Sequence, residues 1–336
     1  MRIDAYTHFI PGKIFEKLES SGKGDIVKRM RGVPSIYDLD IRRKIVDKYK
    51  DYAQILSYPM PPLEILTQGA ELDEYAKLIN DGFVEICDKH RDHFPGWVAQ
   101  VSMAAPDAGI KEAQRALKAG ALGVQIYTNV SGRPLDEPAF TDFFAEMEKT
   151  GKPIWLHPVR AANFPDYLAE KKSRYEIWWA LGWSYETAAA MSRLVFSGIM
   201  DRHPKLKIIT HHFGGIVPML EGRVGYGWDQ LGARTSDEDL GAVLKSLKKR
   251  PLDYFKHDFY VDTAVFGGAP ATKCGFEFYD LDKVVFASDC PFDPEKGTLY
   301  IRETLRILDE MNLPKADRAK VDYQNLEAIT GVKLVK

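Results

Sequence analysis

Short apolar segments rich in β-branched residues alternate along the chain with longer segments whose apolar positions recur every three or four residues. The short segments predict β-strands, and the longer ones predict helices that bury one face. Strands are expected at residues 3–6, 53–57, 97–101, 123–127, 153–157, 207–211, 259–262 and 284–287. Helices are expected between them at residues 73–90, 109–119, 140–150, 185–197 and 237–248.

The alternation of these elements predicts the fold class. Strands separated by helices form parallel βαβ units, and eight such strands suit a closed α/β barrel, the (β/α)8 TIM barrel. An open, doubly wound sheet is the alternative, but the glycine-rich dinucleotide-binding pattern is missing after the first strand. Since no linker or internal repeat divides the sequence, residues 1–336 are expected to form a single domain.

Two segments do not fit the plain alternation. Residues 9–45 are expected to be an insertion after strand 1, because they contain prolines and several glycines. Residues 158–184 form a long segment after strand 5 that is rich in aromatic residues, namely Phe164, Tyr167, Tyr175, Trp178, Trp179 and Trp183. Such a segment is expected to cover a pocket at the barrel mouth or to form a subunit interface, and simple packing of a long loop is the plainer alternative.

Polar residues mark four of the expected strand ends. They are Tyr6 and His8 on the first strand, His157 on the fifth, His211 and His212 on the sixth, and Asp289 after the eighth. In a barrel of this kind, the carboxyl ends of the strands carry the active site. Imidazole nitrogen and carboxylate oxygen suit Zn²⁺ or a similar divalent ion. Any one of these residues could instead be a satisfied polar group, and Asp289 alone could merely form a turn.

Composition and charge exclude several classes of partner. With 46 basic and 48 acidic side chains the net charge is −2, which gives no reason to expect binding to nucleic acid or an acidic membrane. Three cysteines in 336 residues do not form a disulfide framework, which favours a reducing compartment. No signal peptide or membrane-spanning stretch is apparent, so a cytoplasmic location is expected.

The polar strand ends and their flanking residues resemble a known family. The x-x-His of strand one, "LHP", "HFGG" and "SDCPF", in this order and spacing, resemble the amidohydrolase superfamily. More narrowly, they are similar to the branch that contains 2-amino-3-carboxymuconate-6-semialdehyde decarboxylase and γ-resorcylate decarboxylase. The similarity runs over nearly the whole chain, and residues 182–223 are its most specific block.

The resemblance implies roles for the strand-end residues. It makes His8, His157 and Asp289 ligands of a divalent metal, with Zn²⁺ preferred and Mn²⁺ or another divalent ion as alternatives. It makes His212 the residue that orients or deprotonates metal-bound water. His211, one position earlier, is expected to point away from His212 and to be structural.

Two arginines bear on the substrate according to the same resemblance. Arg42 lies where relatives hold the substrate carboxylate, and Arg223 matches an arginine that relatives donate from a neighbouring subunit. A guanidinium binds a carboxylate bidentately, so both positions favour a small carboxylate substrate, and Arg223 favours a homodimer. The alternative is that each arginine pairs with a nearby carboxylate of the chain.

Tyr6 departs from the family pattern, which has His-x-His or Glu-x-His at the end of strand one. Three interpretations remain open. Tyr6 is an oxygen ligand of the metal, although its ordinary pKa near 10 makes a phenolate costly. It stands off the metal and hydrogen-bonds a ligand or the substrate. Or the site has lost its metal.

The expected function is that of a metal-dependent decarboxylase, a carbon–carbon lyase acting on a small unsaturated or aromatic carboxylic acid. In this mechanism His212 and Asp289 manage the proton that replaces CO₂. A metal-dependent hydrolase of an amide, ester or lactone requires the same residues and is the first alternative. A barrel that has lost its metal and serves only in binding is the second.

Overall fold

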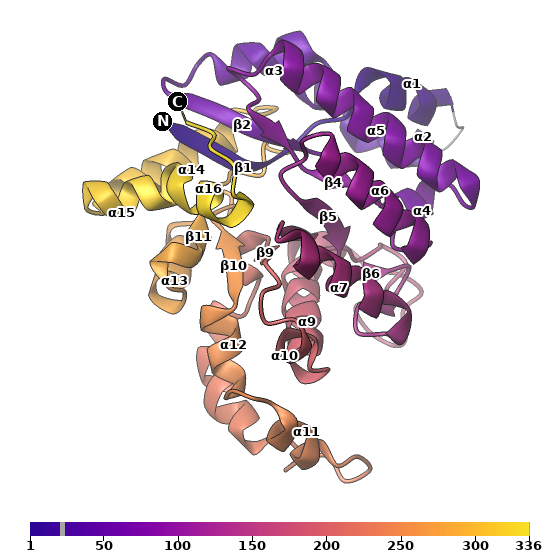
Figure 1. Cartoon of the computed structure of the whole chain (residues 1–336), viewed down its shortest axis with the longest axis vertical. Coiled ribbons are helices and arrows are strands. Elements are labelled where there is room, and N and C mark those ends of the chain that lie inside the picture. The colour runs from indigo at the N-terminus through magenta and orange to yellow at the C-terminus, as the bar shows by residue number, and fades with distance from the viewer. Residues whose placement is uncertain (21–23, 336) are drawn as a thin grey trace.

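The computed structural model describes residues 1–20 and 24–335, and parallel strands form its centre (Figure 1). These strands are β1 Arg2–His8, β2 Tyr52–Ser57, β3 Gly96–Trp97, β4 Ala99–Gln100, β5 Val124–Tyr127, β8 Ile154–His157, β9 Ile208–Thr210, β10 Phe259–Asp262 and β11 Val284–Val285. They pair in the order β1-β2-β3 and β4-β5-β8-β9-β10-β11. Since only Val98 separates β3 from β4, the two together make the third strand of the barrel.

The barrel closes between its first and last strands. The backbone N–H of Ala5 donates to the carbonyl of Phe286 at 2.8 Å, and that of His8 donates to the carbonyl of Cys290 at 2.8 Å. The predicted (β/α)8 barrel is thus confirmed, with its eight strands in the expected order.

Two apolar clusters explain why the strands are buried on both faces. A smaller cluster joins residues from around the ring of strands, among them Ile3, Ile55, Trp155 and Ile209, with Leu326 of a C-terminal helix. Residues of opposite strands can touch only inside the barrel, so this cluster fills its interior. The larger cluster packs the outer faces of the strands against the surrounding helices. Burial on both faces gives the near-continuous apolar strands seen in the sequence.

The helices surround the barrel, and the predicted ones lie within a few residues of their expected bounds. The longer helices are α1 Gly12–Ser20, α2 Gly24–Arg31, α3 Leu39–Val46, α5 Ala70–Lys89, α6 Pro106–Lys118, α7 Thr141–Thr150, α9 Gly182–Phe196, α11 Leu240–Ser246, α12 Pro251–His257, α13 Ala269–Phe278 and α14 Leu299–Glu310. The shorter ones are α4 Leu63–Leu66, α8 Ile177–Ala180, α10 Ile199–Arg202, α15 Lys315–Ala319 and α16 Asn325–Thr330. None of the helices within the described residues has the length and apolar character needed to cross a lipid bilayer.

The two irregular segments have definite structures. The expected insertion, residues 9–45, contains α1, α2 and α3, while its residues 21–23 lie outside the described part of the chain. The aromatic segment, residues 158–184, is mostly irregular and leads through α8 into α9. A short hairpin that the sequence pattern did not predict, β6 Asn129–Val130 and β7 Arg133–Pro134, follows β5. Beyond β9 the chain extends into an arm that ends near α11 (Figure 1).

Candidate active site

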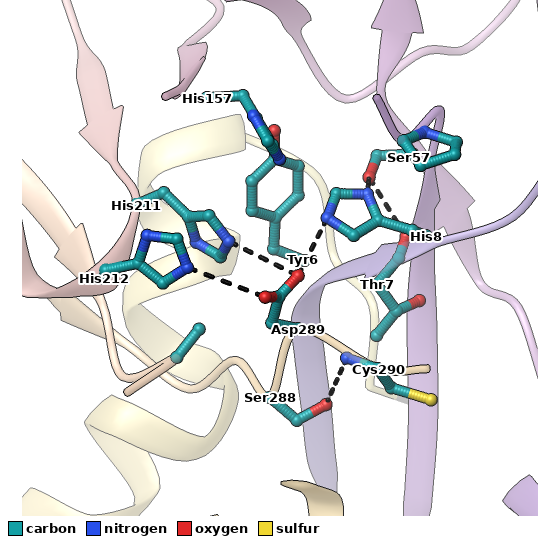
Figure 2. A network of polar contacts seen from close by, with 12 residues as sticks. Tyr6, Thr7, His8, Ser57, His157, His211, His212, Ser288, Asp289 and Cys290 are labelled. Atoms are coloured by element: carbon teal, nitrogen blue, oxygen red, sulfur yellow. Dashed lines mark hydrogen bonds and ion pairs between the residues drawn. The ribbon is translucent and has the colours of Figure 1, made fainter. Parts of the chain in front are cut away.

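The polar strand-end residues meet at the carboxyl end of the barrel (Figure 2). Asp289 lies at their centre. One of its carboxylate oxygens is 2.9 Å from Nε2 of His8 and 3.5 Å from Nε2 of His211. Its other oxygen is 3.6 Å from Nε2 of His212. The ring of His157 lies 5.3 Å from that of His8, between centroids. Residues more than 280 positions apart in sequence therefore share one buried site.

Three of the histidines are oriented by hydrogen bonds at Nδ1. The Nδ1 of His8 lies 2.9 Å from the Ser57 hydroxyl, which itself donates to the carbonyl of Thr7. The Nδ1 of His157 donates to the carbonyl of Pro158 at 2.7 Å. The Nδ1 of His211 lies 2.6 Å from a carboxylate oxygen of Asp262. With the Nδ1 proton used in this way, each ring directs Nε2 toward the centre of the site.

The backbone around Asp289 is held by a second carboxylate behind the site. Asp289 has φ of 63°, in the left-handed region that is uncommon for a side-chain-bearing residue. Its neighbour Ser288 donates its backbone N–H to Asp4 at 3.0 Å and its hydroxyl to the same carboxyl. The Ser288 hydroxyl in turn accepts the N–H of Cys290 at 3.2 Å. These contacts fix the turn that aims Asp289 at the histidines.

Arg42 belongs to this support. Its side chain is fully buried, and its Nε donates to Gln54 at 2.7 Å. Its terminal nitrogens lie 3.4 Å from the carbonyls of Ser35 and Cys290. The guanidinium is therefore held by atoms of the chain itself, and its contact with a substrate carboxylate stays a prediction.

The electrostatics of the site follow from burial and from the two carboxylates. Burial raises the pKa of Asp289, but its contacts with His211, His212 and His8 outweigh this effect and hold the pKa well below its usual range. Burial lowers the pKa of His8 and of His212, and it lowers that of His157 strongly, with help from the neighbouring histidines. An ionised carboxylate beside neutral imidazoles is the protonation state that a metal requires of its ligands.

His211 behaves differently from these histidines. Burial lowers its pKa, but the carboxylates of Asp262 and Asp289 outweigh burial and raise the pKa to about 9. The sequence-based expectation that His211 points away from His212 is wrong. Its ring lies 3.7 Å from that of His212, between centroids, and both rings face Asp289.

The buried donor atoms fit a divalent cation. The Nε2 atoms of His8, His211 and His212 are buried, and none of the described residues gives them a hydrogen-bond partner. The ligand atoms of His8, His157 and His211 lie within 4.8 Å of one another, as do those of His211, His212 and Asp289. Buried imidazole nitrogens directed at one carboxylate, with no proton donor between them, are the arrangement that a metal ion satisfies.

Tyr6 lies beside this group, but its hydroxyl is turned away from it. The hydroxyl donates to Oε1 of Gln125 at 2.6 Å, and the residue is almost completely buried. Burial, with the nearby Tyr127, Asp262 and Asp289, raises the pKa of Tyr6 well above its usual value. The ring edge packs against His211 and His8, with centroids 4.6 and 5.0 Å away (Figure 2). Tyr6 is therefore a neutral wall of the site, and its contact with substrate stays a prediction.

Aromatic rings cover the histidines from the start of α9 and from two loops. Trp183 packs edge-on against His157 at 5.5 Å, Phe266 against His212 at 5.4 Å, and Phe292 is tilted against His8 at 5.7 Å, all between centroids. Of the aromatic segment, the part near Trp183 covers the site, while Tyr167 and Tyr175 are exposed. The segment therefore covers the site with one part and leaves another part exposed.

Two further residues, Asp262 and Arg223, bear on the site. Asp262, at the end of β10, was missed, although its place at a strand end is the signal that identified the other residues. Arg223 lies exposed on the helical turn Arg223–Gly227, outside the group of histidines of its own chain.

Comparison with known proteins identifies the family. A sequence model of the amidohydrolase family matches residues 3–328, so the chain belongs to that family. The γ-resorcylate decarboxylase of Rhodococcus jostii is 28% identical over 334 residues, covering 94% of this chain and 91% of the relative. The 2-amino-3-carboxymuconate-6-semialdehyde decarboxylase of Dictyostelium discoideum is 26% identical over 310 residues, covering 87% and 82%.

A solved structure supports the same fold. The dihydroxybenzoic acid decarboxylase of Polaromonas, determined with bound manganese and the inhibitor 2-nitroresorcinol, aligns with a TM-score of 0.79. The sequence identity is 22%, and the alignment covers 98% of this chain and 96% of that one. The resemblance noted from the strand-end motifs is thus confirmed at the level of family and fold.

Proposed function

We propose that this protein is a metal-dependent decarboxylase that removes CO₂ from a small aromatic or unsaturated carboxylic acid. The observation that carries the proposal is the buried group of histidines around Asp289 at the carboxyl end of the barrel. Both relatives compared above are named as decarboxylases, which favours this activity over the hydrolase alternative. The proposal covers residues 1–336 as one catalytic domain.

His8, His157 and Asp289 would hold the divalent ion. Two imidazoles and a carboxylate suit Zn²⁺, and Mn²⁺ is the second candidate because the Polaromonas enzyme was determined with it. When bound, the ion supplies Lewis acidity that stabilises negative charge on substrate oxygens.

The residues of the chain handle the proton. Decarboxylation breaks the bond between the carboxylate carbon and its neighbour, CO₂ leaves, and the electron pair stays on the neighbouring carbon. That carbon must gain one proton. His212 is assigned to deliver this proton, which its imidazole takes up from water, with Asp289 holding the ring, since Nε2 of His212 lies 3.6 Å from Asp289 and has no hydrogen-bond partner among the described residues.

The aromatic cover favours a ring-bearing substrate. Trp183, Phe266 and Phe292 border the site with apolar surface, which excludes water and packs well against a planar ring. Low water content also strengthens every electrostatic contact in the site.

A homodimer is part of the proposal. Arg223 is exposed, and Tyr226 on the same turn is 77% exposed, so both are available to a second copy of the chain. In a dimer Arg223 would reach the partner's site and bind the substrate carboxylate there. A cytoplasmic location is proposed because the three cysteines are free thiols.

The test is CO₂ release by purified protein loaded with Mn²⁺ or Zn²⁺. The panel contains 2,6-dihydroxybenzoate and 6-methylsalicylate, together with an ester, a lactone and an amide of similar size. We expect CO₂ from at least one acid and a loss of about 10²- to 10⁴-fold in the His212→Asn variant. The matched control is His203→Asn, because His203 pairs with Glu148 outside the site.

The outcomes separate the alternatives. Hydrolysis without CO₂ release would replace the decarboxylase with the hydrolase. Absence of bound metal, with no change of stability on adding Zn²⁺ or Mn²⁺, would support a barrel that only binds.

A further inference from the structure

We propose that His211 completes the metal-binding group in place of Tyr6, so that His8, His157, His211 and Asp289 together hold the ion. The inference rests on the metal site of the proposed function and deepens it. It assigns a fourth ligand from the sixth barrel strand, where the family pattern expects one from the first.

The hydrogen bonds of His211 leave its Nε2 available as a ligand. Its Nδ1 faces an oxygen of Asp262 at 2.6 Å, and that oxygen can only accept. In the neutral ring the proton therefore resides on Nδ1, and Nε2 presents its lone pair to a bound cation, which displaces any proton from that nitrogen. This Nε2 is buried and lies 3.5 Å from Asp289, and it has no hydrogen-bond partner within the described part of the chain.

His211 shares its surroundings with two predicted ligands. The ligand atoms of His211, His8 and His157 lie within 4.8 Å of one another. The ring of His211 is 5.5 Å from that of His157 and 6.3 Å from that of His8, between centroids. Three imidazoles whose second nitrogens are all anchored to oxygen atoms form a pre-oriented set, which is what a metal site needs.

Tyr6 is excluded from the same role by its own contacts. Its hydroxyl, the only atom that could bind the ion, donates to Gln125 at 2.6 Å. Its ring fills the space between His8 and His211 with carbon atoms (Figure 2). Tyr6 thus occupies the sequence position at which the family pattern has a metal ligand, but it supplies no ligand atom. His211 faces the same space from the other side.

Asp262 acts as a positioning residue in this arrangement. One of its oxygens holds the side chain of His211, and the other accepts the backbone N–H of His212 at 3.0 Å and that of Ala264 at 3.1 Å. A carboxylate behind a ligating histidine fixes the ring and increases its basicity.

The test measures zinc binding itself. Wild-type protein and the variants His211→Asn, Asp262→Asn and His203→Asn are stripped with chelator and titrated with Zn²⁺ against a competing dye. X-ray absorption of the zinc-loaded proteins then counts the coordinated imidazoles. We expect three imidazoles in wild type and in His203→Asn, and two in His211→Asn with affinity reduced more than about 100-fold. In Asp262→Asn we expect three imidazoles and an affinity reduced about 10- to 100-fold.

The results discriminate between this inference and the proposed function. Two imidazoles in the wild type, wild-type affinity in His211→Asn, or no zinc uptake at all would overturn the assignment of His211. Three imidazoles without CO₂ release from any acid would uphold it and refute the decarboxylase. A count of two imidazoles in the wild type overturns the assignment even when a variant does not fold, and three imidazoles support His211 when the count falls to two in His211→Asn.

Discussion

Asp4 provides a sharp test of the electrostatics behind the site. It is fully buried, and burial raises its pKa to about 6 despite hydrogen bonds from Ser288 and Tyr52. In the unfolded chain the pKa returns to 3.8. Between these values the folded state binds more protons than the unfolded state, so stability falls as the pH rises through this window.

The magnitude follows from the shift. A difference of about two pKa units corresponds to about 3 kcal/mol of folding free energy, fully lost above about pH 7. About 2 kcal/mol of this falls between about pH 4.5 and pH 7.5, because part of the transition lies below that range. An Asp4→Asn variant does not titrate, so the free-energy difference between wild type and variant should shrink by that amount across the range.

The assay is urea unfolding of both proteins in chelator at several pH values. Other titrations cancel in the difference between the two proteins, which isolates Asp4. Asp40→Asn is the control, because Asp40 is 81% exposed on α3 and should show no comparable pH dependence. A difference between wild type and Asp4→Asn that stays constant with pH would refute the reasoning.

Three further outcomes are expected. A Cβ at Gly275 would lie 2.3 Å from the ring of Phe213, so Gly275→Ala should lower the free energy of unfolding by about 1–3 kcal/mol in urea melts; no loss would contradict this packing. Asn80 is buried and forms hydrogen bonds with both the N–H and the carbonyl of Gln100. Asn80→Ala should therefore lower the free energy of unfolding by about 2–4 kcal/mol in thermal melts, and a loss under about 0.5 kcal/mol would count against the importance of these bonds. Removing divalent metal should lower the melting temperature, and Mn²⁺ at about 100 times its dissociation constant should restore about 2.7 kcal/mol; equal melting curves would argue against a metal site.

The barrel could be predicted because a local pattern of apolar and polar residues indicates each of its elements. Most strands are apolar runs that stop at a polar residue, and the expected strand at residues 259–262 coincides with β10. Residues at successive strand ends must meet in a closed barrel, so the grouping of His8, His157 and Asp289 followed from topology alone.

The orientation of His211 could not be predicted from the same pattern. Alternation of side chains holds for extended backbone, but His212 and Phe213 have φ of 58° and 51°, where that rule does not apply. The turn brings both rings to the same side.

The hydrogen-bond partners of Arg42 and Tyr6 could not be predicted for a different reason. The partners of Arg42 include Cys290, which lies 248 positions away. The partner of Tyr6, Gln125, lies 119 positions away. A local motif shows that such a side chain is present, but only the assembled barrel shows which distant atom it contacts.

The two oxygens of Asp262 tie the side chain of His211 to the backbone of His212. Asp262 therefore couples the position of the His211 ring to the backbone that carries His212. If His211 binds the ion, a change in ionic radius would move His211 and, through Asp262, the imidazole of His212. Exchanging Zn²⁺ for Mn²⁺ would then alter the geometry of proton delivery as well as the strength of the Lewis acid.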